Sequence, residues 1–330
     1  MIKALKHRNI IYGFCAVWII LFHVFRRISM PFIPVITSFV SLGSMAVDLF
    51  LFLSGMSLAI SADRHQYVCN GWNEYYVRRM KRILIPYLIV GIPYYLWNSL
   101  AEHEGTIIMK IVLFIANISS ANFWLRGTQT TWFVYAIILL YLVFPWLYQF
   151  LKKCGRGKVY ILLAGMILFA VAASYLPILK NSVIVWARLP IFTLGILAGI
   201  YKDRSFGFRM DWMPAIFVLL SLGWIVSMSE IDESISLPPV YRYILFIPMT
   251  AAAILLIQRL PEELKHVQLL VTAGNLSLEM YLVHVTLLHP LKYYGVIDQL
   301  GYWLYLILPV ITLPVAMAVG GLEKKIIKKD

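Results

Sequence analysis

Long apolar runs recur along this chain, and each is close to the roughly 20 residues that a helix needs to cross a lipid bilayer. Hydrophobic residues make up 61% of the 330 residues and charged residues only 14%, whereas soluble domains are about half apolar and a quarter charged. The sequence therefore predicts an all-α fold, a polytopic transmembrane helical bundle of about ten spans. The expected spans lie at 9–27, 36–60, 83–100, 131–151, 159–177, 183–201, 212–229, 240–257, 269–290 and 302–321.

The basic residues divide unevenly between the two expected sides of the membrane. Segment 106–118 is apolar but short, so we place it in the interface or as a re-entrant segment, which leaves both termini cytoplasmic. All but eight of the 29 Lys and Arg residues then lie on the cytoplasmic side, as the positive-inside rule requires. The exceptions are Arg26, Arg27, Lys110, Arg126, Lys180, Arg188, Arg242 and Lys292. The expected outer loops carry acids at Glu102, Glu104, Glu230, Asp232 and Glu233.

The rest of the composition narrows the class of protein. We expect one integral domain over 1–330 in the cell membrane, because the longest polar stretch, 61–82, is too short for a soluble domain. The net charge of +13 fits cytoplasmic loops that face anionic lipid, so we expect the lipid bilayer and no nucleic acid as a partner. Cys15, Cys69 and Cys154 have no metal-site spacing, so no metal is expected.

Five ionisable residues lie well inside the expected spans: His23, Asp48, Arg188, Glu279 and His284. A single acid or base at the membrane centre costs about 2.5–3.5 kcal/mol on insertion scales, so these groups must be paired, neutral or hydrated. The span directions place the two histidines and the arginine in the outer half and both carboxylates near the middle. We expect one polar chamber that opens outward. The packing alternative is that Arg188 pairs with Asp48 or Glu279 and the histidines bond to backbone carbonyls.

A cluster of four cations precedes the third span, in YYVRRMKRILIPY over 75–87. Arg79 and Arg82 are three residues apart and share one helical face, where two guanidinium groups could bind a polyphosphate bidentately. Arg78 and Lys81 lie beside them. The alternative is an ordinary topology anchor at anionic lipid.

Five segments in order resemble motifs of the acyltransferase 3 family of integral membrane O-acyltransferases. They are AVWIILFH (16–23), MAVDLFLFLSG (45–55), YYVRRMKRILIPY (75–87), TWFVYAIILLYLVFP (131–145) and LSLEMYLVH (276–284). The resemblance implies transfer of an acyl group, usually acetyl, from cytoplasmic acetyl-CoA or another acyl-CoA to a hydroxyl of an extracytoplasmic cell-surface glycan or its lipid-linked precursor. It also implies that His23 matches the family's proposed catalytic histidine, and that Arg79 and Arg82 match its donor-binding pair.

One position departs from the family pattern. The family has an arginine eleven residues before the histidine, where this chain has Tyr12. Arg8 lies one turn nearer the cytoplasm on roughly the same face and is the candidate substitute. Many relatives also append a hydrolase-like domain of the SGNH type. The chain ends at Asp330, so we expect it to complete transfer alone or to pass the group to a partner.

The residue patterns and the resemblance together predict the site. We expect His23, Asp48 and Glu279 to be catalytic. His23 would act as general base or as transient acyl carrier, and either carboxylate could hold its tautomer. Direct transfer and an acyl-histidine both remain open. The acyl-CoA phosphates would bind Arg78, Arg79, Lys81 and Arg82.

Two other functions compete with this prediction. A proton-coupled transporter could use an intramembrane relay of Asp48, Glu279, Arg188 and His23, although the sequence shows no inverted repeat. A non-catalytic member of a glycan-export complex would tolerate alanine at the polar positions. The sequence is also compatible with a homo-oligomer and with a partner protein in glycan assembly.

Overall fold

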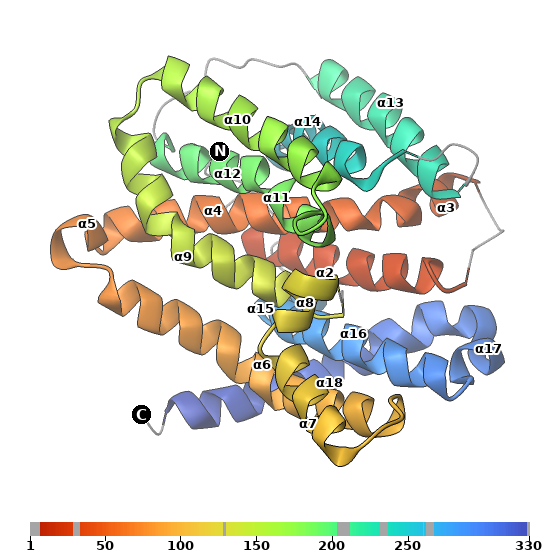
Figure 1. Ribbon diagram of the computed structural model, residues 1–330. Coiled ribbons are helices and arrows are strands. Elements are labelled where there is room, and N and C mark those ends of the chain that lie inside the picture. The colour runs from red at the N-terminus through yellow and green to blue at the C-terminus, as the bar shows by residue number, and fades with distance from the viewer. Residues whose placement is uncertain are drawn as a thin grey trace.

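The computed structural model describes residues 7–28, 34–127, 130–202, 212–231, 237–259, 261 and 267–328. Every regular element in these ranges is a helix, which confirms the all-α prediction (Figure 1). The α-helices are α2 (Arg8–Phe25), α3 (Pro34–Ser41), α4 (Ala46–Arg64), α5 (Tyr67–Asn70), α6 (Asn73–Ala101), α7 (Ile107–Ile118), α8 (Ala121–Arg126), α9 (Trp132–Lys153), α10 (Arg156–Tyr175), α11 (Val183–Trp186), α12 (Leu189–Ile200), α13 (Trp212–Ile231), α14 (Pro239–Ile257), α15 (Gln268–Asn275), α16 (Ser277–Tyr293), α17 (Val296–Leu300) and α18 (Leu304–Ile327). Short 3₁₀ turns over Leu42–Met45, Lys180–Ser182 and Gly301–Trp303 lead into α4, α11 and α18.

Nine helical segments in the described ranges are long and apolar enough to cross a membrane, which confirms a polytopic bundle. The expected span over 269–290 is not among them, because the chain breaks at Leu276 into α15 and α16. These have eight and 17 residues, or about 12 and 26 Å at 1.5 Å per residue, so neither crosses a 30 Å core alone. Helix α7 has only 12 residues, so the expected short segment is indeed too short to span.

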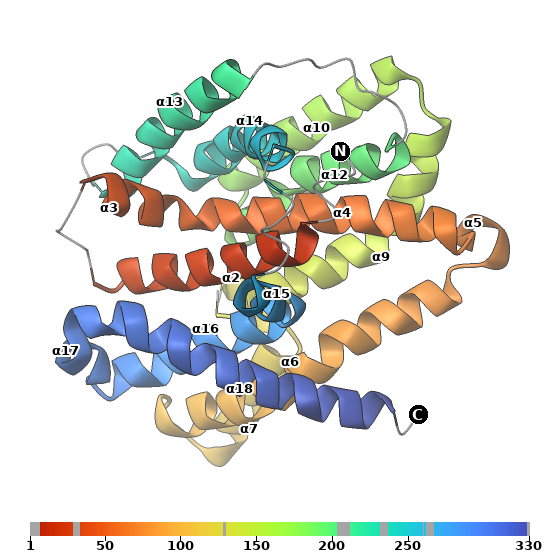
Figure 2. The ribbon, with the colours of Figure 1, turned by 180° about the vertical axis from the view of Figure 1, so that it is seen from behind.

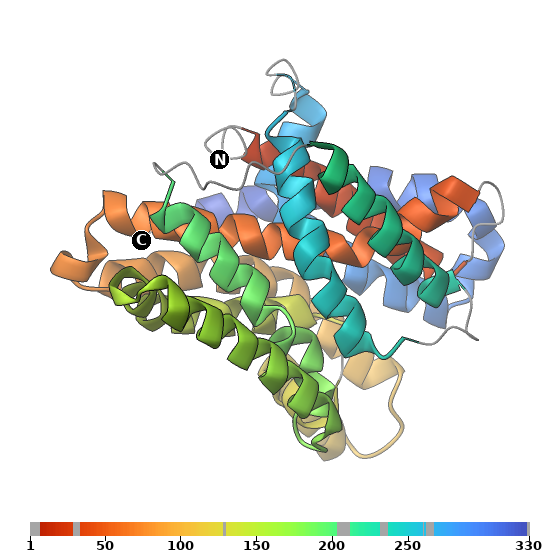
Figure 3. The same cartoon turned by 90° about the horizontal axis from the view of Figure 1, so that it is seen from above.

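Helices α2 and α4 lie side by side through the middle of the bundle (Figures 1 and 2). Helices α10, α12, α13 and α14 cover one flank, and Figure 3 shows them fanned across that face. Helices α6, α15, α16 and α18 lie on the opposite flank, while α9 packs against both α6 and α12. The two central helices therefore have neighbours on both flanks, and their polar side chains can meet groups from either one.

Glycines allow the closest helix pairs to form. A Cβ atom on Gly195 of α12 would collide with the carbonyl of Phe52, and one on Gly55 of α4 would collide with the carbonyl of Phe192. Gly274 of α15 makes a similar backbone approach to Asn9 of α2. Lipid is as apolar as the side chains, so helices in a membrane gain stability from close packing at small residues.

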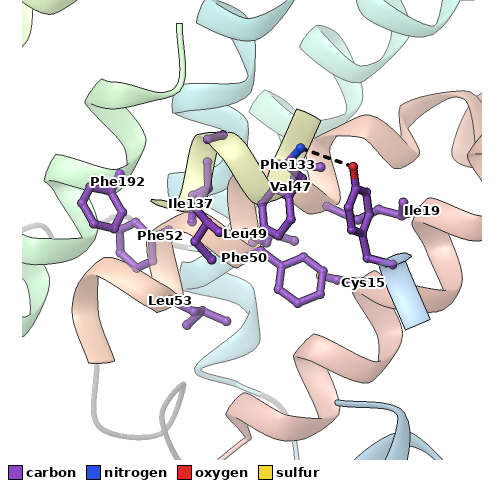
Figure 4. Packing of buried hydrophobic residues seen from close by; sticks show 14 of the residues in the cluster. Cys15, Ile19, Val47, Leu49, Phe50, Phe52, Leu53, Phe133, Ile137 and Phe192 are labelled. Atoms are coloured by element: carbon purple, nitrogen blue, oxygen red, sulfur yellow. Dashed lines mark hydrogen bonds between the residues drawn. The ribbon is translucent and has the colours of Figure 1, made fainter. Parts of the chain in front are cut away.

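Apolar side chains fill the space between α2, α4 and α9 (Figure 4). Ile19, Val47, Phe50 and Phe133 are all buried there, and the rings of Phe50 and Phe133 have centroids 6.3 Å apart. The backbone N–H of Phe133 donates to the hydroxyl of Tyr281 at 3.3 Å, which ties α9 to α16. This apolar layer lies between two polar regions.

The two ends of the described chain meet at one end of the bundle. The amide of Asn9 donates to Asn275 Oδ1 at 2.8 Å, Arg82 donates to the Asn275 carbonyl at 3.1 Å, and Arg82 contacts Glu323 at 2.5 Å. Both termini thus lie on the same side, as the charge pattern predicts. Asp232 and Glu233, assigned above to an outer loop, lie outside the described residues.

Replacing Gly195 with alanine tests the close packing of α4 and α12. We expect Gly195→Ala to lower the free energy of unfolding by about 1–3 kcal/mol, because the new methyl group overlaps backbone that cannot move easily. Gly165→Ala is the matched control, since a Cβ there meets nothing within 4 Å. Melting temperatures in one detergent compare the two; equal values would contradict the packing described here.

Candidate functional site

Two cavities open on either side of the apolar layer. The first, the Arg82 cavity, has a volume of about 270 Å³. The second, the His23 cavity, has a volume of about 640 Å³. Ile19 and Val47 line both, so the cavities adjoin at this pair of side chains. The polar lining of the Arg82 cavity includes Arg8, Asn9, Tyr12, Arg79, Arg82 and Asn275. The polar and charged lining of the His23 cavity includes His23, Arg26, Arg27, Lys180, Arg188, Glu230, Arg242 and His289.

Arg82 joins four helices at its cavity. Its guanidinium forms ion pairs with Glu279 of α16 and Glu323 of α18, and it donates to the C-terminal carbonyl of α15 at Asn275. Both carboxylates are almost fully buried, whereas the Arg82 side chain is 41% exposed. The last carbonyls of a helix lack partners within it, so this hydrogen bond also stabilises the break before α16.

The remaining cations of the basic cluster differ in position. Arg79 is half-buried and lines the Arg82 cavity, and within the described ranges it forms no ion pair. Arg78 is exposed, pairs with Glu74 at 2.5 Å and does not line the cavity. Lys81 does not line it either. The shared helical face of Arg79 and Arg82 therefore places those two, of the four predicted donor-binding residues, at the cavity.

Position 12, where the family pattern has an arginine, also lies at this cavity. Tyr12 lines it, with its hydroxyl 3.4 Å from Ser54 and its ring stacked on Phe50 at 4.9 Å. Arg8, one turn earlier in α2, lines it as well. Position 12 has no cation in this chain, but Arg8 brings a positive charge to the same cavity.

His23 lies in the last turns of α2 and is half-buried at the wall of its cavity. Its ring centroid is 5.1 Å from that of His284 on α16. His284 is buried, and its Nδ1 lies 2.9 Å from the Met280 carbonyl, which can only accept, so Nδ1 carries the proton. The other nitrogen, Nε2, is buried and has no hydrogen-bond partner among the residues that the structure describes. His284 therefore presents a free acceptor beside His23.

Asp48 pairs with Arg188 instead of with a histidine. Arg188 Nε lies 3.3 Å from Asp48 Oδ2, and both side chains are essentially fully buried. The guanidinium also packs over Tyr243, with Cζ 4.2 Å from the ring centroid, and donates to the Ile184 carbonyl at 3.0 Å. The packing alternative stated above is thus what the structure has for Asp48, Arg188 and His284.

The expectation of one polar chamber was wrong for Glu279. The break at Leu276 places Glu279 in the first turn of α16, at the Arg82 end, and not in the middle of a continuous span. His284 lies five residues further along α16, about 7.5 Å along the axis. Among the described residues, no hydrogen bond or ion pair joins His23 to Asp48 or Glu279. The expected carboxylate–histidine contact is therefore absent from this structure.

The structure adds residues that the sequence reasoning did not select. Glu323 follows directly after the last expected span, and an acid among the terminal lysines was the available signal. His289, on α16, contacts Glu102 at 2.8 Å and the Tyr94 hydroxyl at 2.6 Å. No pattern along the sequence links Glu102 with His289, because they are distant in the chain. In the ranges described, no group of three His, Cys, Asp or Glu residues is placed to hold a metal ion.

Removing the Asp48 carboxylate tests its pairing with Arg188. We expect Asp48→Asn to lower the free energy of unfolding by about 3–5 kcal/mol, because a buried guanidinium loses its counter-charge. Asp63→Asn is the control, since the Asp63–Lys152 pair is partly exposed and worth about 0–1 kcal/mol. Thermal unfolding measures both. A variant with normal stability and lost activity would instead favour a direct catalytic role for Asp48.

The comparison with protein families identifies the chain. The family Acyl_transf_3, described as an acyltransferase domain, matches residues 9–321. No curated protein and no solved structure matches the sequence. The family match covers nearly the whole chain, including the lining of the His23 cavity, that of the Arg82 cavity except Arg8, and the motifs at 16–23 and 276–284. The chain therefore belongs to the acyltransferase 3 family and is a multi-pass membrane acyltransferase.

Proposed function

We propose that this acyltransferase moves an acyl group, most simply acetyl, from cytoplasmic acyl-CoA to a hydroxyl of a cell-surface glycan or its lipid-linked precursor. The proposal places the protein in the cell membrane, with the Arg82 cavity facing the cytoplasm and the His23 cavity facing outward. The observation that carries it is the junction of the two cavities at Ile19 and Val47. One cavity offers arginines for the donor, and the other offers an imidazole for the acceptor.

The donor's phosphates are too highly charged to enter lipid and need cations at the membrane surface. Arg79 would bind them bidentately, while Arg82 adds positive charge and Arg8 supplies a further guanidinium at the same cavity. Arg78 and Lys81, on the same segment of α6, would raise the local concentration of the anionic donor. Because Arg82 already bridges Glu279 and Glu323, Arg79 is the cation most available to a ligand.

The length of the donor is close to the distance between the arginines and His23. Arg8 and His23 are both on α2 and 15 residues apart, which is about 22 Å along the helix axis. The pantetheine arm of CoA reaches roughly 15–20 Å, about half of the ~30 Å hydrocarbon core. The arm would pass Ile19 and Val47, whose apolar side chains suit its apolar thioester end.

His23 would supply the chemistry at the thioester. In direct transfer it removes the proton of the acceptor hydroxyl, the oxygen attacks the thioester carbonyl, and CoA leaves as the thiol after taking that proton. In the two-step form one ring nitrogen of His23 attacks the thioester carbonyl, and CoA leaves as the thiol with the proton of the other ring nitrogen. The acceptor hydroxyl then takes the acyl group and returns its proton to the imidazole. The free Nε2 of His284 would accept a hydrogen bond from His23 and so fix its tautomer, the role usually given to a carboxylate.

The contacts of the carboxylates favour this function over a proton relay. A relay needs protonatable groups in contact with one another. Asp48, in the first turn of α4, is held by Arg188, and Glu279, in the first turn of α16, is held by Arg82. In the described ranges, no hydrogen bond or ion pair joins His23 to either carboxylate. The two carboxylates would then act by positioning arginines.

Substituting His23 tests the catalytic role. We expect His23→Ala to abolish acyl transfer in isolated membranes while the protein still inserts, folds and binds CoA, because the residue lines a cavity and makes no ion pair in the described ranges. The readout is acylation of the surface glycan by mass spectrometry. His103→Ala, at an exposed histidine, should leave transfer unchanged. Normal transfer by His23→Ala would exclude the mechanism.

Stabilisation by CoA tests the donor site. A ligand that binds only the folded state raises its stability, so we expect CoA to raise the melting temperature of the purified protein in detergent. Arg79→Gln should remove most of this increase, and Arg78→Gln should remove less, because only Arg79 lines the cavity. Arg156→Gln, at an exposed arginine that begins α10, is the control. An equal loss in all three variants would point to non-specific binding of the anion.

A further inference from the structure

Most of the basic residues that lie outside the expected cytoplasmic segments line one cavity. Eight Lys and Arg residues lie outside the expected cytoplasmic segments, and five of them line the His23 cavity. They come from the two residues after α2, from the 3₁₀ turn before α11, from the residue before α12 and from α14, so no single segment brings them together. The five are Arg26, Arg27, Lys180, Arg188 and Arg242.

The acids at this cavity do not balance these cations. Asp48, which does not itself line the cavity, neutralises Arg188. Glu230 is shared between Arg26, at 2.9 Å, and Arg242. Glu102 contacts His289, which also lines the cavity. Five cations thus face three carboxylates, which leaves at least two positive charges uncompensated among the described residues.

The cations that line this cavity are also accessible to a ligand. Arg26, Arg27 and Lys180 are exposed, and in the described ranges neither Arg27 nor Lys180 forms an ion pair. Arg242 is half-buried, and its Nε is buried with no hydrogen-bond partner in the described part of the chain. Cations gathered in a cleft with low-dielectric walls repel one another and attract an anion strongly. The wall of the cavity is therefore suited to a ligand that carries more than one negative charge.

We propose that the acceptor bears phosphate groups, which bind Arg26, Arg27, Lys180 and Arg242 while its hydroxyl lies at His23. This inference rests on the proposed function and narrows its acceptor class. A single carboxylate supplies one negative charge, whereas a diphosphate supplies two or three and matches the excess. Arginine forks bind phosphate oxygens bidentately, which would also orient the hydroxyl for transfer. A lipid-linked sugar diphosphate and a phosphodiester polymer both present this chemistry outside the membrane.

The test uses the purified full-length protein in detergent with simple anions as probes. We expect inorganic diphosphate to raise the melting temperature at low salt, and the increase to shrink as salt rises. In the double variant Arg27→Gln, Lys180→Gln the apparent affinity should fall about tenfold or more, since charged hydrogen bonds are lost. The matched control is Lys110→Gln with Lys292→Gln, which removes two outer cations that do not line the cavity.

The choice of anion distinguishes a sugar diphosphate from a phosphodiester polymer, and both from an acceptor that carries only carboxylates. Stronger stabilisation by inorganic diphosphate supports a sugar diphosphate, and stronger stabilisation by diethyl phosphate supports a phosphodiester polymer. Equal stabilisation by glucuronate, or none by either phosphate, overturns the inference. So does a diphosphate effect that survives in the double variant but is lost in Arg79→Gln, because the anion would then occupy the Arg82 cavity.

CoA in parallel samples distinguishes this inference from the proposed function. Stabilisation by CoA that is unchanged in Arg27→Gln, Lys180→Gln, with no phosphate effect, leaves the donor site intact and refutes the phosphate-bearing acceptor. Stabilisation by diphosphate that depends on Arg27 and Lys180, with no effect of CoA, keeps the anion site and refutes the proposed donor. The two proposals can therefore fail separately.

Discussion

The contacts of Arg82 hold one end of this bundle together. Its guanidinium pairs with Glu279 and Glu323 and caps α15 at Asn275, so α6 meets three helices of the C-terminal part of the chain at one side chain. Burying two carboxylates in a membrane protein is costly unless a cation and hydrogen bonds satisfy them. The break at Leu276, the shape of the Arg82 cavity and the placing of Arg79 all depend on this arrangement.

A thin apolar layer between two polar cavities suits an enzyme whose substrates arrive from opposite sides. Ile19 and Val47 belong to both cavity walls. In the function proposed above, the thioester would approach them from the Arg82 cavity and the hydroxyl from the His23 cavity. Ions and water meet an apolar barrier at the same point. Because the phosphates would stay on arginines at one end, only the uncharged arm of the donor needs to enter the bundle.

Two buried carboxylates of this protein hold arginine side chains in place. Asp48 holds Arg188 in the wall of the His23 cavity, and Glu279 holds Arg82 in the wall of the other. The group next to His23 is a second histidine, His284, whose tautomer is set by a backbone carbonyl. A neutral partner suits an imidazole that must stay uncharged, and therefore basic, in a low-dielectric site.

Hydropathy and charge along the sequence determined the helical class, the positions of most spans and the common side of the two termini, because these properties depend on residues close together in the chain. The spacing of Arg79 and Arg82 likewise determined that they share a face. Only the tertiary structure decided which buried charges pair, since pairing depends on how each helix is rotated against its neighbours. It moved Glu279 to Arg82 by breaking a span that hydropathy predicts to be continuous, and it brought Glu323 to the same site. The gathering of Arg26, Lys180 and Arg242 around His23 was invisible for the same reason, because contacts between distant segments leave no periodic pattern in the sequence.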